Sequence, residues 1–200
     1  MADFNDISTV STLNSAGRSV FASVEMQSIS PTITSTSLSG RVQAKSIGAQ
    51  QFAFRGTLVP MTHTEFKPIY SFLVSKRGKF STFTINLPIP HEGTFTTGTA
   101  SGTIGQSTIA VTGTGTLKAG DFVGFNNSSH SKAYMVTADV TIGTGTTVNI
   151  TPPLHATESA QTLHTGGAVD FKVRQKTDTQ GYAVGVESMY NTEIDIEEAV

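Results

Sequence analysis

Histidine and cysteine are the side chains that most often bind metals or move protons, and the chain has five of the first and none of the second. The histidines are His63, His91, His130, His155 and His164. No two of them have the i, i+2 or i, i+4 spacing of a zinc site, and no cysteine can complete one. We therefore interpret them as scattered loop residues and predict no metal site and no cofactor.

Carboxylates are the second class of candidate functional residues, because they can bind calcium or act in pairs in acid–base catalysis. Asp121, Asp139, Asp170 and Asp178 stand singly at the ends of expected strands or turns, where aspartate typically accepts hydrogen bonds from its own backbone. Acidic residues become dense only at 193–198, where charged and apolar residues alternate. That alternation predicts a terminal strand with one solvated face, and neither pattern predicts a calcium loop or a catalytic pair.

Nucleophiles and phosphate-binding loops are equally poorly supported. Ser107 lies in the segment GQSTI, which lacks the second glycine of the G-x-S-x-G motif. The Gly-Thr-Gly segments at 113–115 and 143–145 complete no phosphate-binding motif and precede no helical pattern, so we interpret them as hairpin turns. We predict no catalytic residue and expect that the chain is not an enzyme.

Composition narrows the classes further. Of the 200 residues only 14% are charged, against roughly 25% in a typical soluble domain, and the net charge is −2. The near-neutral balance gives no basic footprint for sequence-specific nucleic-acid binding, and no run approaches the ~18 apolar residues that span a membrane. The N-terminus lacks the basic start and apolar stretch of a secretory signal. A chain with so little charge suggests a surface covered by neighbouring subunits, because interface cores are depleted of charge.

The elements that would position any site are predominantly strands. Thr and Ser dominate the polar residues, and Thr favours strands over helices. Apolar residues alternate over short runs separated by turn residues, for example at Phe83, Ile85 and Leu87 and at Phe171 and Val173. The predicted fold class is mainly β: a β-sandwich with one α-helix plus an inserted small β-barrel-like domain.

One segment has helical rather than strand periodicity. The apolar residues Phe66, Ile69, Tyr70, Leu73 and Val74 follow the i, i+3, i+4, i+7, i+8 pattern. Thr62 with Glu65 matches a capping box, and Gly78 can adopt the left-handed conformation that ends a helix. We predict a helix of about three turns at roughly 64–77. The basic residues around its end, Lys67, Lys76, Arg77 and Lys79, predict a patch that complements the helix dipole or contacts an acidic neighbouring subunit.

The distribution of charge indicates two domains. Between 93 and 169 charged residues almost vanish and Gly-Thr dipeptides multiply, and strand patterns resume after that region. We predict a β-sandwich domain formed by 1–92 together with 170–200, and an inserted β domain at 93–169.

The order of these features resembles a known family. A β-rich N-terminal part leads into the helix, then into a strand, an inserted module and a short C-terminal strand pair; the segments that carry the likeness are 52–62, 72–88, 117–125, 133–136, 148–154 and 194–199. This arrangement is similar to minor tail proteins of tailed bacteriophages, most closely the distal tail proteins between tail tube and tip.

The resemblance implies a structural role in the virion tail after assembly in the host cytoplasm. Distal tail proteins form a ring, commonly a hexamer, whose sandwich domain continues the channel of the tail tube, while a second β domain projects outward. The implied partners are further copies of the chain, the tail tube protein and the hub or tip proteins, with DNA passing only through the ring lumen. The inserted module departs from sugar-binding relatives, because it contains no Trp and only Tyr134.

Three alternatives differ from this interpretation. A tail tube protein is also a β-sandwich with one helix. A receptor- or glycan-binding β module would need a concave site lined by aromatic rings, with Tyr134 as the candidate in the inserted domain. A hydrolase acting on cell-wall polymer would need an acid pair or a metal set, which the sequence patterns above do not provide.

Overall fold

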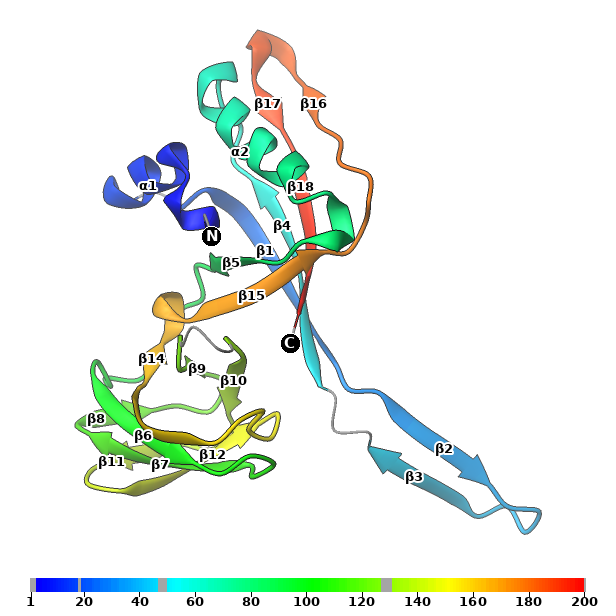
Figure 1. Cartoon of the computed structure of the whole chain (residues 1–200), viewed down its shortest axis with the longest axis vertical. Coiled ribbons are helices and arrows are strands. Elements are labelled where there is room, and N and C mark those ends of the chain that lie inside the picture. The colour runs from blue at the N-terminus through cyan, green and yellow to red at the C-terminus, as the bar shows by residue number, and fades with distance from the viewer. Residues whose placement is uncertain (1–2, 18, 47–49, 127–130, 200) are drawn as a thin grey trace.

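A computed structural model describes residues 3–17, 19–46, 50–126 and 131–199. It contains two main antiparallel sheets, each with its own hydrophobic core, and a long hairpin that projects away from both (Figure 1). The predicted fold class, mainly β with a sandwich-like part and a barrel-like module, is confirmed.

The first sheet has five strands, and its members come from both ends of the chain. Their order is β1 (Phe21–Ile29), β4 (Gln51–Leu58), β18 (Glu193–Glu198), β15 (Asp170–Gln175) and β5 (Phe83–Asn86). The predicted terminal strand at 193–198 exists, but it occupies the centre of the sheet, where it pairs with β4 on one side and β15 on the other.

Two helices pack against this sheet. Helix α2 (His63–Ser75) matches the predicted helix within two residues, and Glu65 accepts hydrogen bonds from the backbone N–H and the hydroxyl of Thr62, at 2.9 and 2.7 Å. At its end both Arg77 and Gly78 have left-handed φ angles, of 54° and 61°. A Cβ on Gly78 would lie 2.5 Å from the Asp178 carboxylate, so glycine is needed there for space as well as for its backbone angle.

The other helix, α1 (Ser8–Ser15), was not predicted from the sequence. Its residues, STVSTLNS, have low helix propensity, and it follows a single 3₁₀ turn, η1 (Phe4–Asp6). Val10 and Leu13 are buried in the core of the five-stranded sheet, and the Thr9 hydroxyl donates to the Glu65 carbonyl at 2.9 Å. Tertiary burial therefore stabilises a helix that local preference does not favour.

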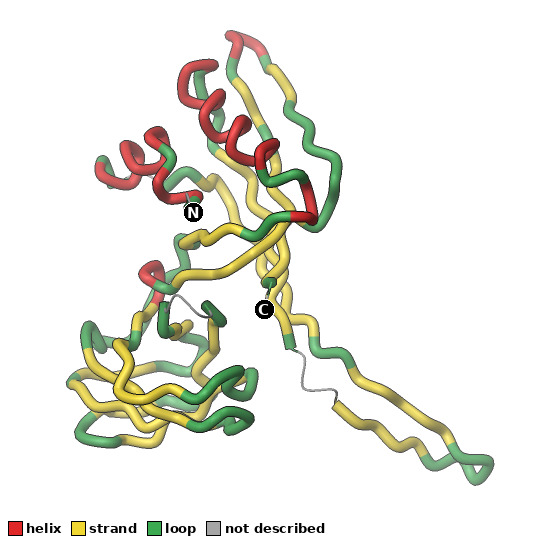
Figure 2. The backbone as a smooth tube through the Cα atoms, viewed as in Figure 1, coloured by secondary structure: helices red, strands yellow, loops and turns green. Residues whose placement is uncertain are grey.

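The second sheet has seven strands and curves into a nearly closed barrel (Figure 2). Its order is β13 (Glu158–Thr162), β6 (Gly98–Gly102), β7 (Thr108–Gly113), β12 (Thr146–Thr151), β10 (Ala133–Val136), β9 (Phe122–Gly124) and β14 (His164–Thr165). A separate pair, β8 (Gly115–Leu117) with β11 (Val140–Ile142), packs beside it. We call residues 95–165 the barrel; its core includes Phe95, Tyr134 and Val148, all at most 1% exposed.

The Gly-Thr-Gly segments are corners, so the hairpin interpretation is wrong. Residues 113–115 join β7 to β8 and residues 143–145 join β11 to β12, and in both cases the two strands belong to different sheets. The corners meet, because the Gly113 N–H donates to the Gly143 carbonyl at 3.1 Å. A Cβ on Gly115 would lie 2.7 Å from the Phe95 backbone nitrogen, which leaves glycine as the residue that fits this close approach.

The remaining elements include a hairpin that we call the arm, residues 32–46. Its strands β2 (Thr32–Thr36) and β3 (Val42–Ser46) pair only with each other, and every residue in them is exposed. In Figures 1 and 2 the arm extends from the ends of β1 and β4 away from the rest of the chain. The shorter elements are η2 (Gly78–Phe80), η3 (Gly166–Ala168), β16 (Ala183–Val184), η4 (Val186–Ser188) and β17 (Tyr190–Asn191).

A buried ion pair joins the two sheets. Lys132, just before β10, places its Nζ 2.7 Å from Oε2 of Glu198 at the end of β18, and the two side chains are 6% and 0% exposed. The Glu198 carboxylate also accepts the backbone N–H groups of Phe52 and Ala133, and Lys132 donates to the Gln50 carbonyl. Each charge is therefore hydrogen-bonded on several sides, which is the condition for burying it.

Candidate interaction surfaces

The histidines lie in separate places. The His63 ring packs at a tilt against Tyr190, and His155 donates its backbone N–H to the Tyr134 hydroxyl. His164 lies in β14, and His91 places Nδ1 3.1 Å from Oδ2 of Asp121. His130 lies outside the described residues. Within the described part of the chain, no three His, Asp or Glu side chains are close enough to hold a metal ion.

The four single aspartates mainly connect distant segments, which corrects the expectation of purely local hydrogen bonds. Asp121 does accept from Lys118 in its own turn, at 2.8 Å, but also from the backbone of Glu92 and Gly93. The other three accept from residues 20 to 99 positions away: Asp139 from Ala119, Asp170 from Asn86 and Asp178 from Lys79. Their role in the described structure is to hold loops together.

Tyr134 cannot serve as the sugar-stacking ring proposed for the inserted domain. Its side chain is 0% exposed in the core of the barrel, and its hydroxyl accepts the backbone N–H of His155 at 3.0 Å. Burial raises the pKa of its phenol to about 12, since the charged form would lose its solvation there.

The basic patch expected around the end of α2 is smaller than predicted. Lys76 is only 8% exposed, and its ammonium lies 4.6 Å from the centre of the Phe72 ring, within cation–π distance. Lys67, Arg77 and Lys79 are on the surface or at the helix end. Lys76 therefore contributes mainly through packing of its stem and ammonium against aromatic rings.

The outer face of the five-stranded sheet carries charges of alternating sign. Glu25, Arg55 and Asp195 stand opposite one another on β1, β4 and β18, and Arg55 also binds Glu193 at 2.6 Å. Hydrogen bonding and the charge of Glu193 raise the pKa of Arg55. Three carboxylates surround the single cation Arg55, so this cluster is net negative and does not attract an anion such as a nucleic acid.

The arm presents apolar side chains directly to solvent. Ile33 and Val42 are 60% and 66% exposed, and Leu38 at the tip is exposed beyond its reference value, at 111%. The tip is a closed turn: the Ser37 N–H donates to the Arg41 carbonyl and the Gly40 N–H to the Ser37 carbonyl, both at 2.9 Å. Leu38 thus sits where turns usually carry polar residues, on a backbone held by hydrogen bonds.

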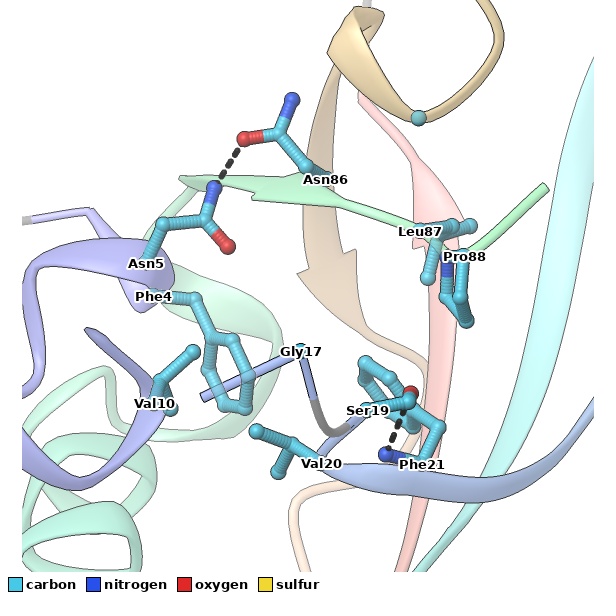
Figure 3. Close-up of a pocket in the computed structure, with 11 residues that line it drawn as sticks. Phe4, Asn5, Val10, Gly17, Ser19, Val20, Phe21, Asn86, Leu87 and Pro88 are labelled. Carbon is cyan, nitrogen blue, oxygen red and sulfur yellow. Dashed lines mark hydrogen bonds between the residues drawn. The ribbon is translucent and has the colours of Figure 1, made fainter. Parts of the chain in front are cut away.

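A pocket of about 300 Å³ with apolar walls, which we call the N-terminal pocket, lies beside α1 (Figure 3), on the side of the five-stranded sheet away from the arm (Figure 1). Its apolar walls are Phe4, Val10, Val20, Phe21, Leu87 and Pro88. Uncharged polar groups stand around them, including Ser19 and an Asn5–Asn86 side-chain hydrogen bond. The pocket exists because α1, which local preference does not favour, folds back over the ends of β1 and β5.

A second pocket, also about 300 Å³, has a different character and lies beneath α2. Tyr70 and Leu73 form its apolar side, while Arg55, Gln180 and Asp195 are among its polar residues. An aromatic ring with amides and charged groups around a concave site is a combination that suits polar ligands.

The sequence interpretation had not singled out the arm or either pocket. The alternation around Ile33 and the Ser-Gly turn at 39–40 signal a hairpin, whereas the pockets combine residues from segments far apart in the chain and leave no local signal. No family model and no curated protein sequence matches the chain. Among the described residues, no helix has the length and apolar character needed to cross a lipid bilayer.

Proposed function

We propose that this chain is a structural subunit of a phage tail tip or baseplate, where copies of it form a ring that connects the tail tube to the hub or tip. The observation that carries the proposal is the arm. The ten strand residues of the arm bury no face against the described chain, so their side chains add no burial energy to a monomer. The arm also leaves Ile33 and Val42 of its strands and Leu38 of its turn in water.

Two further features indicate that the chain functions as part of an assembly and not as a monomer. The five-stranded sheet ends in β1 and β5; η1 packs against β5, whereas no described strand pairs with the outer edge of β1, which can approach a neighbouring strand. The chain also has only 13 basic and 15 acidic residues, and several of them neutralise one another on the outer face of that sheet or are buried between the sheets. A ring subunit covers much of its surface with neighbours and needs few charges for solubility.

The test is the state of the purified chain. Light scattering after size exclusion should give a mass that is a fixed multiple of 21.1 kDa, and negative-stain images should show closed rings. A monomer at every concentration, with no ring in the virion, would overturn the proposal. Open-ended stacks of rings would instead favour the tail tube alternative.

The pocket beneath α2 favours a second candidate, a glycan-binding role at the tail tip. Tyr70 offers a ring edge or face, and Arg55 and Asp195 can hydrogen-bond hydroxyl groups. Calorimetric titration with fragments of host surface polysaccharide tests this candidate. Binding that Tyr70→Ala abolishes supports it, and binding that persists in that variant rejects this pocket as the site.

A further inference from the structure

The arm tip and the N-terminal pocket are complementary in shape and polarity. Leu38 is a branched apolar side chain at the end of a hydrogen-bonded turn. The pocket is an apolar cavity of about 300 Å³, large enough for one leucine side chain and part of the turn that carries it. Five of the six apolar wall residues are at most 9% exposed, so the hollow is a narrow surface pocket. An exposed apolar side chain and a surface pocket with apolar walls on one molecule are the two halves of a heterologous contact.

Charge complementarity supports the same pairing. Between residues 29 and 50 the chain has two basic residues, Arg41 and Lys45, and no acidic residue. Residues 3 to 21 have two acidic residues, Asp3 and Asp6, which flank Phe4 of the pocket wall, and one basic residue, Arg18, which lies outside the described residues. Neither Arg41 nor Lys45 forms an ion pair with any residue that the structure describes.

A chain cannot make this contact with itself. The arm leaves the sheet on the side opposite α1 and points away from it, so the tip of the arm is remote from α1 of its own chain (Figure 1). A side chain that fills the pocket from outside therefore belongs to another molecule, and a second copy of the chain brings the matching apolar side chain and the matching charge together.

We infer that Leu38 of one copy inserts into the N-terminal pocket of the next copy, with Arg41 and Lys45 facing Asp3 and Asp6. The inference deepens the proposed ring and rests on it. Because the two surfaces differ, the contact is directional: each subunit gives an arm and receives one, and the chain of contacts closes when the rotation between subunits divides a full turn.

The absence of cysteine allows a direct test by cross-linking. The chain with both Leu38→Cys and Ser19→Cys places one thiol on the arm tip and one at the exposed edge of the pocket. Mild oxidation of the assembled protein should give a ladder of covalent multimers on a non-reducing gel, since inserting Leu38 would bring the two Cα atoms close to disulfide range. The matched control pairs Leu38→Cys with Ile104→Cys, which is 60% exposed in a turn of the barrel, and should stay monomeric on the gel.

The outcomes separate this inference from the proposed function. Dimers from Leu38→Cys alone would mean that arms meet arms, and an assembled ring without a ladder would mean that another occupant, a different tail protein or a small apolar molecule, fills the pocket. Either result overturns the docking contact and leaves the ring intact. A wild-type chain that is monomeric throughout overturns both.

A second experiment measures self-association without introducing cysteine, in case the added thiols disturb the contact between subunits. Leu38→Asp changes a fully exposed residue and should leave the fold unchanged, yet it should weaken self-association by roughly ten- to a hundredfold, the loss expected for one buried leucine. Ile104→Asp should leave association unchanged. Equal behaviour of the two variants would contradict the inference.

Discussion

The arm and the barrel are built from similar residues, but only the barrel has a core. Both consist of short antiparallel strands rich in Thr, Ser and Gly, and both contain alternating apolar residues, as in Val42–Ser46 and in Thr108–Gly113. In the barrel the sheet curves until its apolar faces meet, and Ile109 and Val111 are 2% and 0% exposed. In the arm two strands cannot enclose anything, so the same pattern leaves Val42 66% exposed.

The comparison shows what alternation means. It marks a strand with one apolar face, but it does not say whether that face is covered by the same chain or by another one. In the barrel, closure of the sheet covers the apolar face with the same chain. We propose that in the arm a neighbouring subunit covers the apolar side chains.

The largest expected effect concerns the barrel core. Phe95→Ala should lower the free energy of unfolding by about 4 kcal/mol, because it removes a buried ring that two glycines, Gly98 and Gly113, approach closely. Urea denaturation followed by tyrosine fluorescence measures the change, with Ile104→Ala on the barrel surface as the control. A loss below about 1 kcal/mol would mean that the barrel is not a packed unit.

The second effect concerns the pair that joins the barrel to the five-stranded sheet. Glu198→Gln should cost about 3 kcal/mol, since it leaves the Lys132 ammonium buried without a countercharge and turns an amide NH₂ toward backbone donors. The neighbouring residue supplies the control: Glu197 pairs with Arg174 on the exposed face, so Glu197→Gln should cost less than about 1 kcal/mol. Equal losses in the same denaturation assay would show that burial does not distinguish these two carboxylates.

An effect of intermediate size is the loss of stability at high pH that arises from Tyr134 in the barrel core. The pKa of Tyr134 is raised to about 12 in the folded state, so folded protein holds this proton where the unfolded chain, with a pKa near 10, releases it. The stabilisation is complete below about pH 10 and is lost as pH rises, by roughly 2 kcal/mol at pH 12. Unfolding free energies at pH 9 to 12 should therefore fall less in Tyr134→Phe than in the wild type, and parallel curves would contradict this.

The smallest effect is expected in the arm. Under conditions that keep the chain monomeric, Ile33→Ala together with Leu38→Ala should change the free energy of unfolding by no more than about 0.5 kcal/mol, because neither side chain is buried. The same urea assay measures it. A destabilisation above 1 kcal/mol would mean that the arm packs against its own chain in solution.

Local signals made much of the fold predictable. The Phe66, Ile69 and Leu73 stripe with the Thr62–Glu65 cap predicted α2 within two residues, and apolar alternation predicted the β class. Helix α1 was missed because Ser and Thr carry no helical preference, and its formation depends on burying Val10 and Leu13. The Gly-Thr-Gly segments were recognised as turns, but their use as corners depends on strands that pair elsewhere.

The candidate surfaces were less predictable because they depend on contacts between distant residues. Lys132 and Glu198 are 66 positions apart, so no spacing rule marks them as a pair. The N-terminal pocket combines residues near 4–21, 86–88 and 167. Leu38 is visible in the sequence as an apolar residue in a turn, but only the structure shows that no described part of the chain covers it.

The central position of β18 fixes an order of events on the ribosome. All strands of the barrel, and the other four strands of the five-stranded sheet, are synthesised before residues 193–198. The β1–β4 ribbon and the β5–β15 pair therefore remain separate until the last strand emerges and joins them. Until then β4 has an unpaired edge, while the barrel can already close, so the nascent chain carries a finished module beside an unfinished one.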